Sequence, residues 1–273
     1  AYTPHPDGFS DTADLVRIYR DFGPADLAPH TTAAGVSATI LIQSQPNDQD
    51  TDYLCELGER TPEVAAVVGW VDLESPSAAA RIATLATRPK LRGVRPMLQD
   101  LADDRILAAR ADAVHALIAN DLSFDALVRP RHLPHLRIFA KRNPALRIVI
   151  DHAGKPDIAN RALDPWRADM RSLAELPNVY CKVSGLVTEA RASWQTDDLA
   201  PCVEHLIRCF GAPRLMWGSD WPVVEMAAGY SQWLRAAQSL TAHLPPDGIA
   251  AIFHDTAASF YHAIQSRAVS LGG

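Results

Sequence analysis

The chain has 273 residues, of which 48% are hydrophobic and 21% charged, a mixture typical of one large or two small globular domains. A net charge of -6 without a basic stripe argues against a nucleic-acid partner, and no apolar stretch approaches the roughly 18 residues of a membrane span. The four cysteines show no paired spacing and no signal peptide is visible, so we expect reduced thiols in a cytoplasmic protein.

The first 22 residues predict an irregular N-terminal segment. Pro4, Pro6 and Gly8 interrupt it, and it contains no β-branched run that could form a strand. Residues 12–22 then have the pattern of a helix. The sequence therefore predicts coil followed by a helix, and no strand, at this end of the chain.

Strand-like apolar runs recur after this segment, and helical patterns separate them. Most runs are continuous rather than alternating, which is typical of parallel strands that are covered on both faces. They begin roughly 23 to 36 residues apart, about the size of one βα unit. The seven runs are residues 38–43, 64–73, 91–96, 123–130, 146–154, 179–185 and 215–220.

Amphipathic stretches between and after these runs predict helices. No linker, low-complexity tract or shift in composition divides the chain, so we expect a single domain over residues 1–273. The predicted helices are residues 77–88, 103–121, 133–143, 166–176, 198–211, 229–244 and 248–264.

This alternation is compatible with two architectures, an open doubly wound sheet and a closed (β/α)8 barrel. The length matches a barrel of about 250 residues, and no G-x-G-x-x-G motif follows the first run. Only seven runs are present where a barrel needs eight. We therefore predict an α/β fold, a TIM-type barrel whose first strand is missing or irregular. Polar residues end many of the runs, and a barrel gathers these ends at one mouth: Gln43, Asp72, Arg95, Arg129, His152, Lys182, Ser184 and Asp220.

The stretch RLMWGSDWPV places Asp220 at the end of an apolar run, between Trp217 and Trp221. A carboxylate there can ligate a metal, act as a general base towards water, or accept backbone hydrogen bonds, and the two indoles favour a dry pocket. His152 ends another run and can be a ligand, a proton-transfer group or a hydrogen-bonded core residue. At a shared mouth, His152 and Asp220 could hold a divalent metal or move protons during hydrolysis.

Three cations, Arg95, Arg129 and Lys182, also lie at or near strand ends. Cations that converge on a mouth indicate an anionic or oxygen-rich substrate, and an arginine fork suits a carboxylate. The alternative is that each cation pairs with an aspartate at the rim. Both interpretations stay open from the sequence.

Three further residues near strand ends are expected to take no part in catalysis. His132 and His135 follow a strand end where Leu-Pro begins a helix, so we interpret them as structural. Asp151 precedes His152, and alternation along a strand predicts that its side chain points outward.

Residues 19–261 resemble the amidohydrolase-related family, in the branch of fuconolactonase-like and pyrone-dicarboxylate-lactonase-like enzymes. The resemblance implies a TIM-type barrel that hydrolyses a cyclic ester. It implies that Asp220 activates water, that His152 belongs to the active site and that Arg95 faces the substrate, with Trp217, Lys182 and Gln43 as pocket residues. Five motifs carry it in order: VVGWVDLESP, GVRPMLQD, RIVIDHAGKPDI, VYCKVSGLVTEA and RLMWGSDWPV.

One feature of the family is absent from this sequence. Such enzymes open with a His-x-His pair after the first strand, whereas the single early histidine here is His5 in TPHPDG. Either the chain lacks an N-terminal strand, or the enzyme works without the pair, or catalysis is impaired. One divalent metal, zinc, remains an alternative to no metal, but His152 and Asp220 alone supply too few ligands for a closed zinc site.

The leading hypothesis is hydrolysis of a small-molecule lactone, with Asp220 taking a proton from water and Arg95 and Arg129 holding substrate oxygens. One alternative is decarboxylation of an aromatic or heteroaromatic acid, which related barrels perform with a similar His and Asp set. The other is a catalytically impaired barrel that binds a carbohydrate acid. The sequence predicts neither a nucleic-acid partner nor membrane association and leaves the oligomeric state open.

Overall fold

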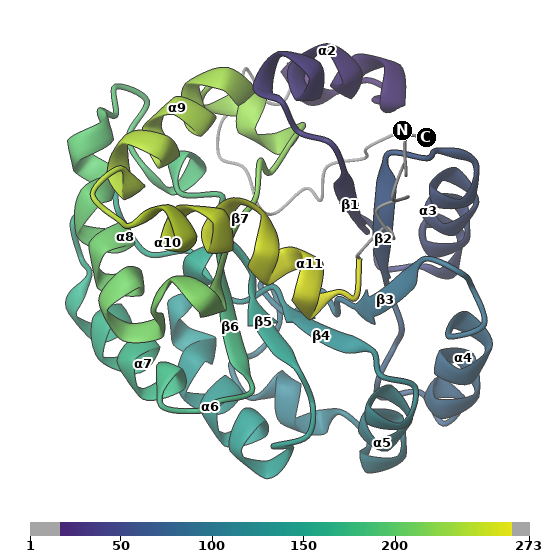
Figure 1. Ribbon diagram of the computed structural model, residues 1–273. Coiled ribbons are helices and arrows are strands. Elements are labelled where there is room, and N and C mark those ends of the chain that lie inside the picture. Colours follow the sequence, from purple (N-terminus) through teal and green to yellow (C-terminus); the bar gives the residue numbers. More distant parts are fainter. Residues whose placement is uncertain (1–16, 264–273) are drawn as a thin grey trace, which may run out of the picture.

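A computed structural model describes residues 17–263. In this part of the chain seven parallel strands pair in sequence order, and the sheet curls with its helices on the outside (Figure 1). The seven predicted strands and the barrel-like architecture are thereby confirmed. The strands are β1 (Thr39–Ile42), β2 (Val64–Gly69), β3 (Leu91–Val94), β4 (Ser123–Ala126), β5 (Ile148–Ile150), β6 (Val179–Val183) and β7 (Leu215–Trp217).

The barrel is incomplete among the described residues. Strands β1 and β7 each pair with a single neighbour, β2 and β6, and no ladder joins them within residues 17–263. The segment before residue 17, where the sequence leaves the eighth strand missing or irregular, lies outside the described residues. The prediction of a TIM-type barrel that is one regular strand short agrees with this arrangement.

Most helices follow the strands around the outside of the sheet, whereas the last two of the described chain lie across the middle of the view in Figure 1. Most lie where the amphipathic patterns predict them, but the predicted helix 103–121 is broken into a 3-10 turn, Arg105–Ala108, and a shorter helix. The helices are α2 (Pro24–Ala34), α3 (Asp48–Arg60), α4 (Ala78–Leu85), α5 (Ala111–Ala119), α6 (Leu133–Arg142), α7 (Asp164–Ala174), α8 (Thr196–Phe210), α9 (Tyr230–Thr241), α10 (Pro246–Ala250) and α11 (Thr256–Phe260).

Two of these helices, α2 and α3, are absent from the sequence prediction. Helix α3 carries a recognisable start signal, because the Asn47 side chain accepts a hydrogen bond from the Asp50 amide at 2.8 Å. Helix α2 has Pro29 inside it and no buried residue, so neither propensity nor apolar spacing marks it. In the described chain no helix has both the length and the apolar character that a membrane span requires.

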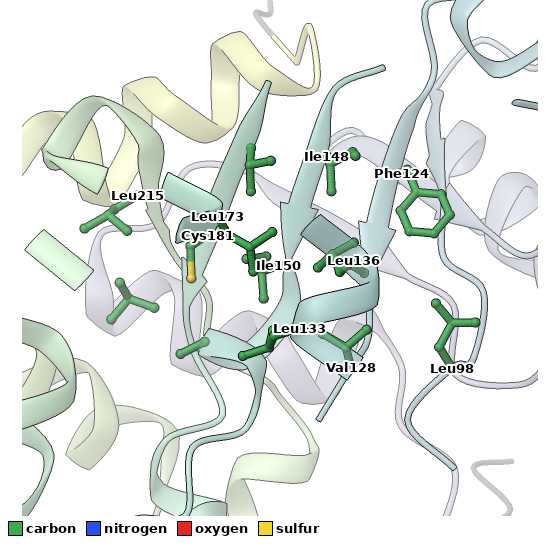
Figure 2. Packing of buried hydrophobic residues seen from close by; sticks show 14 of the residues in the cluster. Leu98, Phe124, Val128, Leu133, Leu136, Ile148, Ile150, Leu173, Cys181 and Leu215 are labelled. Atoms are coloured by element: carbon green, nitrogen blue, oxygen red, sulfur yellow. The ribbon is translucent and has the colours of Figure 1, made fainter. Parts of the chain in front are cut away.

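Side chains alternate between the two faces of the curled sheet. On β5, Ile148 and Ile150 belong to the large outer core that packs against the helices, as Figure 2 shows, with Leu133, Leu136 and Leu173 among their neighbours. Val149 points to the other face. There it joins an inner cluster that Phe260 and Tyr261 at the C-terminal end of the described chain help to fill: Ala66, Val68, Val149, Met216, Phe260 and Tyr261. The barrel interior is therefore packed, and the site lies at the carboxyl ends of the strands.

Candidate active site

His152 and Asp220 come together at the carboxyl ends of β5 and β7. The Nε2 atom of His152 lies 3.6 Å from Oδ1 of Asp220, and the two side chains are only 14% and 13% exposed. Both residues adopt a left-handed backbone conformation, with φ of 50° and 56°. This conformation costs a non-glycine residue about 1–2 kcal/mol, so the surrounding structure must hold both residues in place.

A left-handed turn follows β5 and determines where its two polar residues point. Residues 152–155 all have positive φ, between 50° and 68°. Because Val149 faces inward and the strand ends at Ile150, Asp151 faces inward as well and is fully buried. The prediction that Asp151 points outward is therefore wrong. The turn then reverses the chain, so that His152 faces the same mouth rather than the outer helices.

Two contacts outside the mouth hold this turn. The indole Nε1 of Trp166 in α7 donates a 2.7 Å hydrogen bond to the Ala153 carbonyl, in a fully buried position. The Lys155 ammonium forms a 3.0 Å ion pair with Glu189. Helix α7 and the segment after β6 therefore share the stabilisation of a turn that would be unfavourable in isolation.

A buried ionic network lies inside the barrel, on the inward faces of β4 to β6. The Lys182 ammonium lies 2.6 Å from Asp125 and 2.7 Å from Asp151, and Arg95 pairs with Asp151 at 3.0 Å. The hydroxyl of Tyr261 donates a 2.5 Å hydrogen bond to Asp125. Lys182 and Arg95 are thus paired with aspartates, as in the alternative that the sequence left open, but these aspartates are buried inside the barrel rather than placed at the rim.

The pKa values in this network shift in opposite directions. Burial raises the pKa of Asp125, and it raises the pKa of Tyr261 well above the usual value. Burial acts in the same direction on Asp151, but the positive charges of Lys182 and Arg95 outweigh it and hold the pKa of Asp151 below its usual range. The two cations therefore favour the ionised form of Asp151.

The remaining residues expected in the pocket occupy different surroundings. Gln43 is fully buried, and its side-chain Nε2 donates a 2.6 Å hydrogen bond to the Arg95 backbone carbonyl. The backbone carbonyl of Gln43 accepts a hydrogen bond from the Arg95 guanidinium. Trp217 packs against Tyr230 and Phe253, with ring centroids 5.9 and 6.0 Å away. Gln43 thus joins the network around Arg95, and Trp217 belongs to an aromatic wall beside Asp220.

Arg129 lies at the rim, apart from the network. Its Nε donates a 3.2 Å hydrogen bond to the Gln99 carbonyl, and its guanidinium lies 3.5 Å from Asp100, with both side chains about one-third exposed. Nearby, the His132 Nδ1 accepts a 3.0 Å hydrogen bond from the Arg129 amide, and its Nε2 lies 3.2 Å from the Leu101 carbonyl. These contacts agree with the structural role expected for His132.

Three polar residues of the site have no role in the sequence analysis. The hydroxyl of Ser184, directly after β6, lies 2.9 Å from Nδ1 of His152, and Asp125 and Tyr261 complete the ionic network. A signal existed for two of them. Ser184 shares the inward phase of Lys182, and Asp125 is a charge within an apolar run. Tyr261 lies far along the chain, and nothing local indicates its contact.

The surroundings of His152 favour the neutral form of its ring, which proton transfer or ligation requires. Burial lowers the pKa of His152, and it prevails although the carboxylates of Asp220 and Asp151 act in the opposite direction. One ring nitrogen contacts Ser184 and the other faces Asp220. The imidazole therefore has a defined orientation, which a reactive histidine needs.

The donor set at this mouth does not match a zinc site. A catalytic zinc ion is held by three protein ligands and keeps a fourth position open. Here Nε2 of His152 and a carboxylate oxygen of Asp220 are two donors, and the described residues contain no group of three or more His, Cys, Asp or Glu side chains that could hold a metal. His5 lies outside the described residues.

Comparisons with known proteins agree with the fold. The chain belongs to the amidohydrolase family, whose model matches residues 1–263. It is 50% identical over 261 residues to an L-fucono-1,5-lactonase of Burkholderia ambifaria, covering 93% of this chain and 90% of that protein. A second L-fucono-1,5-lactonase, of Burkholderia multivorans, is 43% identical over 79% of this chain and 77% of its own length. The resemblance inferred from the five motifs is thereby confirmed.

A solved structure supports the same assignment. An amidohydrolase from Burkholderia multivorans, crystallised with bound zinc, superposes with a TM-score of 0.86 at 39% identity, over 92% of each chain. The seven-stranded arrangement described above is therefore the amidohydrolase barrel.

Proposed function

We propose that this protein hydrolyses a neutral sugar lactone to its hydroxy acid. The observation that carries the proposal is the approach of His152 and Asp220 to 3.6 Å at the carboxyl ends of the barrel strands, where enzymes of this fold place their chemistry. The relatives of known activity support the same reaction, because a protein half identical over nine-tenths of the chain is an L-fucono-1,5-lactonase.

In the proposed mechanism, Asp220 is the general base. It accepts a proton from water while the water oxygen attacks the carbonyl carbon of the lactone, and the carbonyl electrons form a tetrahedral oxyanion. When the carbonyl re-forms, the ring C–O bond breaks. The Asp220 carboxyl then returns its proton to the leaving ring oxygen, so one water is consumed and one hydroxy acid is produced. His152 orients the Asp220 carboxylate.

The remaining residues shape the pocket in this proposal. Lys182, Arg95 and Gln43 form a polar floor beneath the reacting pair. Lys182 lies on β6 two residues before Ser184, which contacts His152. Trp217 supplies an apolar wall for the sugar ring. Arg129 reaches substrate oxygens from the rim, where its guanidinium is partly exposed.

Charge pairing favours a neutral substrate. Within residues 17–263 the three cations expected at the mouth all face a carboxylate: Lys182 faces Asp125 and Asp151, Arg95 faces Asp151, and Arg129 faces Asp100. A substrate carboxylate would have to displace one of these aspartates. In the buried pairs, the displaced aspartate would be left as a desolvated charge without a partner. A hydroxylated lactone without a carboxylate avoids this cost.

A substrate panel tests the proposal. Purified protein is incubated with L-fucono-1,5-lactone, D-glucono-1,5-lactone, a pyrone dicarboxylate and an aromatic carboxylic acid, and both acid release and carbon dioxide are measured above the spontaneous rate. We expect acid from the sugar lactones and little reaction with the dicarboxylate. Carbon dioxide from the aromatic acid would instead identify a decarboxylase, and binding without any turnover would identify an impaired barrel.

A further inference from the structure

We propose that Ser184 is a positioning residue that fixes both the orientation and the tautomer of the His152 ring. This inference rests on the proposed function, since it assigns a purpose to an otherwise unassigned contact in the same site. Ser184 is buried, and its hydroxyl lies 2.9 Å from Nδ1 of His152. Within residues 17–263, His152 is the hydrogen-bond partner of that hydroxyl.

The tautomer follows from the groups that face the two ring nitrogens. The carboxylate of Asp220, which faces Nε2, can only accept a hydrogen bond, so the proton of a neutral ring is favoured on Nε2. Nδ1 then carries the lone pair and needs a donor. A serine hydroxyl can rotate to donate, and Ser184 is placed to do so. Its O–H group therefore holds the proton of His152 on the side of Asp220.

The orientation follows from the residue after Ser184. Gly185 has φ of 61°, and a Cβ atom built there would lie 2.7 Å from Cβ, Cγ and Nδ1 of His152. The ring is thus packed directly against the glycine backbone while the serine hydroxyl holds its Nδ1 edge. Ser184 and Gly185 together restrict the orientation of the ring.

The strand order explains why Ser184 can contact His152. β6 lies between β5 and β7 in the sheet, so Ser184 lies between the strand ends that carry His152 and Asp220. Gly218 of the β7 end packs closely against the Ser184 side chain, because a Cβ at Gly218 would lie 3.1 Å from the Ser184 Cβ. The serine is therefore held from both neighbouring strand ends.

The test compares two serine variants with a matched control. Ser184→Ala deletes the hydroxyl, and Ser184→Cys keeps a group of similar size that is a weak donor. Thr241→Val removes a different buried hydroxyl, which bonds the Ala237 carbonyl inside α9. For each protein we measure kcat and KM for L-fucono-1,5-lactone, and the ring ¹⁵N signals of His152 in histidine-labelled protein. His152→Gln identifies those signals by their loss.

We expect Ser184→Ala to lower kcat about 10- to 100-fold, the loss typical when a partner that orients a histidine is removed, with KM within about twofold. Its ring signals should move towards a mixture of tautomers. Ser184→Cys should be intermediate in both measurements, and Thr241→Val should match the wild type in both. If Ser184→Ala does not fold, Ser184→Cys provides the same comparison.

Wild-type ring signals and wild-type kcat in both serine variants would overturn the inference. So would a loss of kcat in Thr241→Val as large as that in Ser184→Ala, because that loss would report only stability. The two proposals fail separately. If the wild-type protein opens no lactone, the proposed reaction is wrong, while the ring signals of the serine variants still decide whether Ser184 sets the tautomer.

Discussion

His152 and Asp220 approach to 3.6 Å although they leave strands β5 and β7, which do not pair with each other. Strand β6 separates them, and Ser184 directly after it contacts Nδ1 of the imidazole, the ring nitrogen that does not face Asp220. Three consecutive strand ends thus supply a carboxylate, an imidazole and a hydroxyl in one row. A curled parallel sheet places these ends at the same mouth, so the relationship belongs to the fold rather than to any one segment.

Replacement of the proposed base should remove turnover while leaving the fold intact. Asp220→Asn keeps the shape of the side chain but cannot accept the water proton, so we expect kcat to fall about 10²- to 10⁴-fold. The measurement is lactone turnover, with circular dichroism as a check on folding. Asp164→Asn, at a side chain that is 93% exposed, is the matched control and should retain activity. Undiminished turnover in Asp220→Asn would refute its role.

Loss of the central lysine should destabilise the protein strongly. Lys182→Met leaves the carboxylates of Asp125 and Asp151 buried without their shared cation, and breaking such a pair costs about 3–5 kcal/mol. Arg161→Met is the control, because Arg161 is 84% exposed in its pair with Asp198 and should contribute at most about 1 kcal/mol. Denaturant unfolding compares the two. Equal small losses would show that the buried network contributes little.

The free energy of unfolding should fall as the pH decreases below 6.5, because His205 in α8 is buried. Burial lowers the pKa of His205 below its usual 6.5, and the charges of Arg171 and Arg208 reinforce this against the hydrogen bond to the Arg167 carbonyl. Below pH 6.5 the unfolded chain therefore binds a proton that the folded protein resists, so the free energy of unfolding decreases. The stability gained above that pH is lost on acidification.

The corresponding experiment measures the free energy of unfolding of the wild type and of His205→Gln between pH 7.5 and 5.5. The wild type should lose more stability over this interval than the variant, because the other titrating groups are common to both proteins. Parallel curves would show that His205 carries no part of the pH dependence.

The left-handed turn after β5 should depend on one indole. Trp166→Phe keeps most of the buried ring but loses the hydrogen bond to the Ala153 carbonyl, which leaves that acceptor unsatisfied at a cost of about 1–3 kcal/mol. Trp194→Phe removes a similar bond, to the Ala227 carbonyl, from another buried tryptophan. We expect both variants to lose stability, but only Trp166→Phe should also reduce turnover, because Ala153 adjoins His152. A loss of turnover in Trp194→Phe alone would contradict this.

The sequence by itself determined the strands, most helices and the two strand ends at which we propose that the chemistry takes place. Apolar runs spaced by one βα unit identify a parallel barrel, and a polar residue at the end of such a run, like Asp220 or His152, is visible without coordinates. These signals are local, since each depends on hydrophobic pattern and position within a single segment. Helix α2 was not predicted, because its sequence has no apolar face to detect.

Only the tertiary structure decided which polar groups meet. The contact of Tyr261 with Asp125 joins the last described helix to a central strand, and no local pattern encodes it. The left-handed turn of residues 152–155 turned Asp151 and His152 to the same side against the usual alternation, because contacts with Trp166, Ser184 and Glu189 outweigh its backbone cost. Buried charges are paired because an unpaired charge in the interior of the barrel is costly, and the partners come from distant strands.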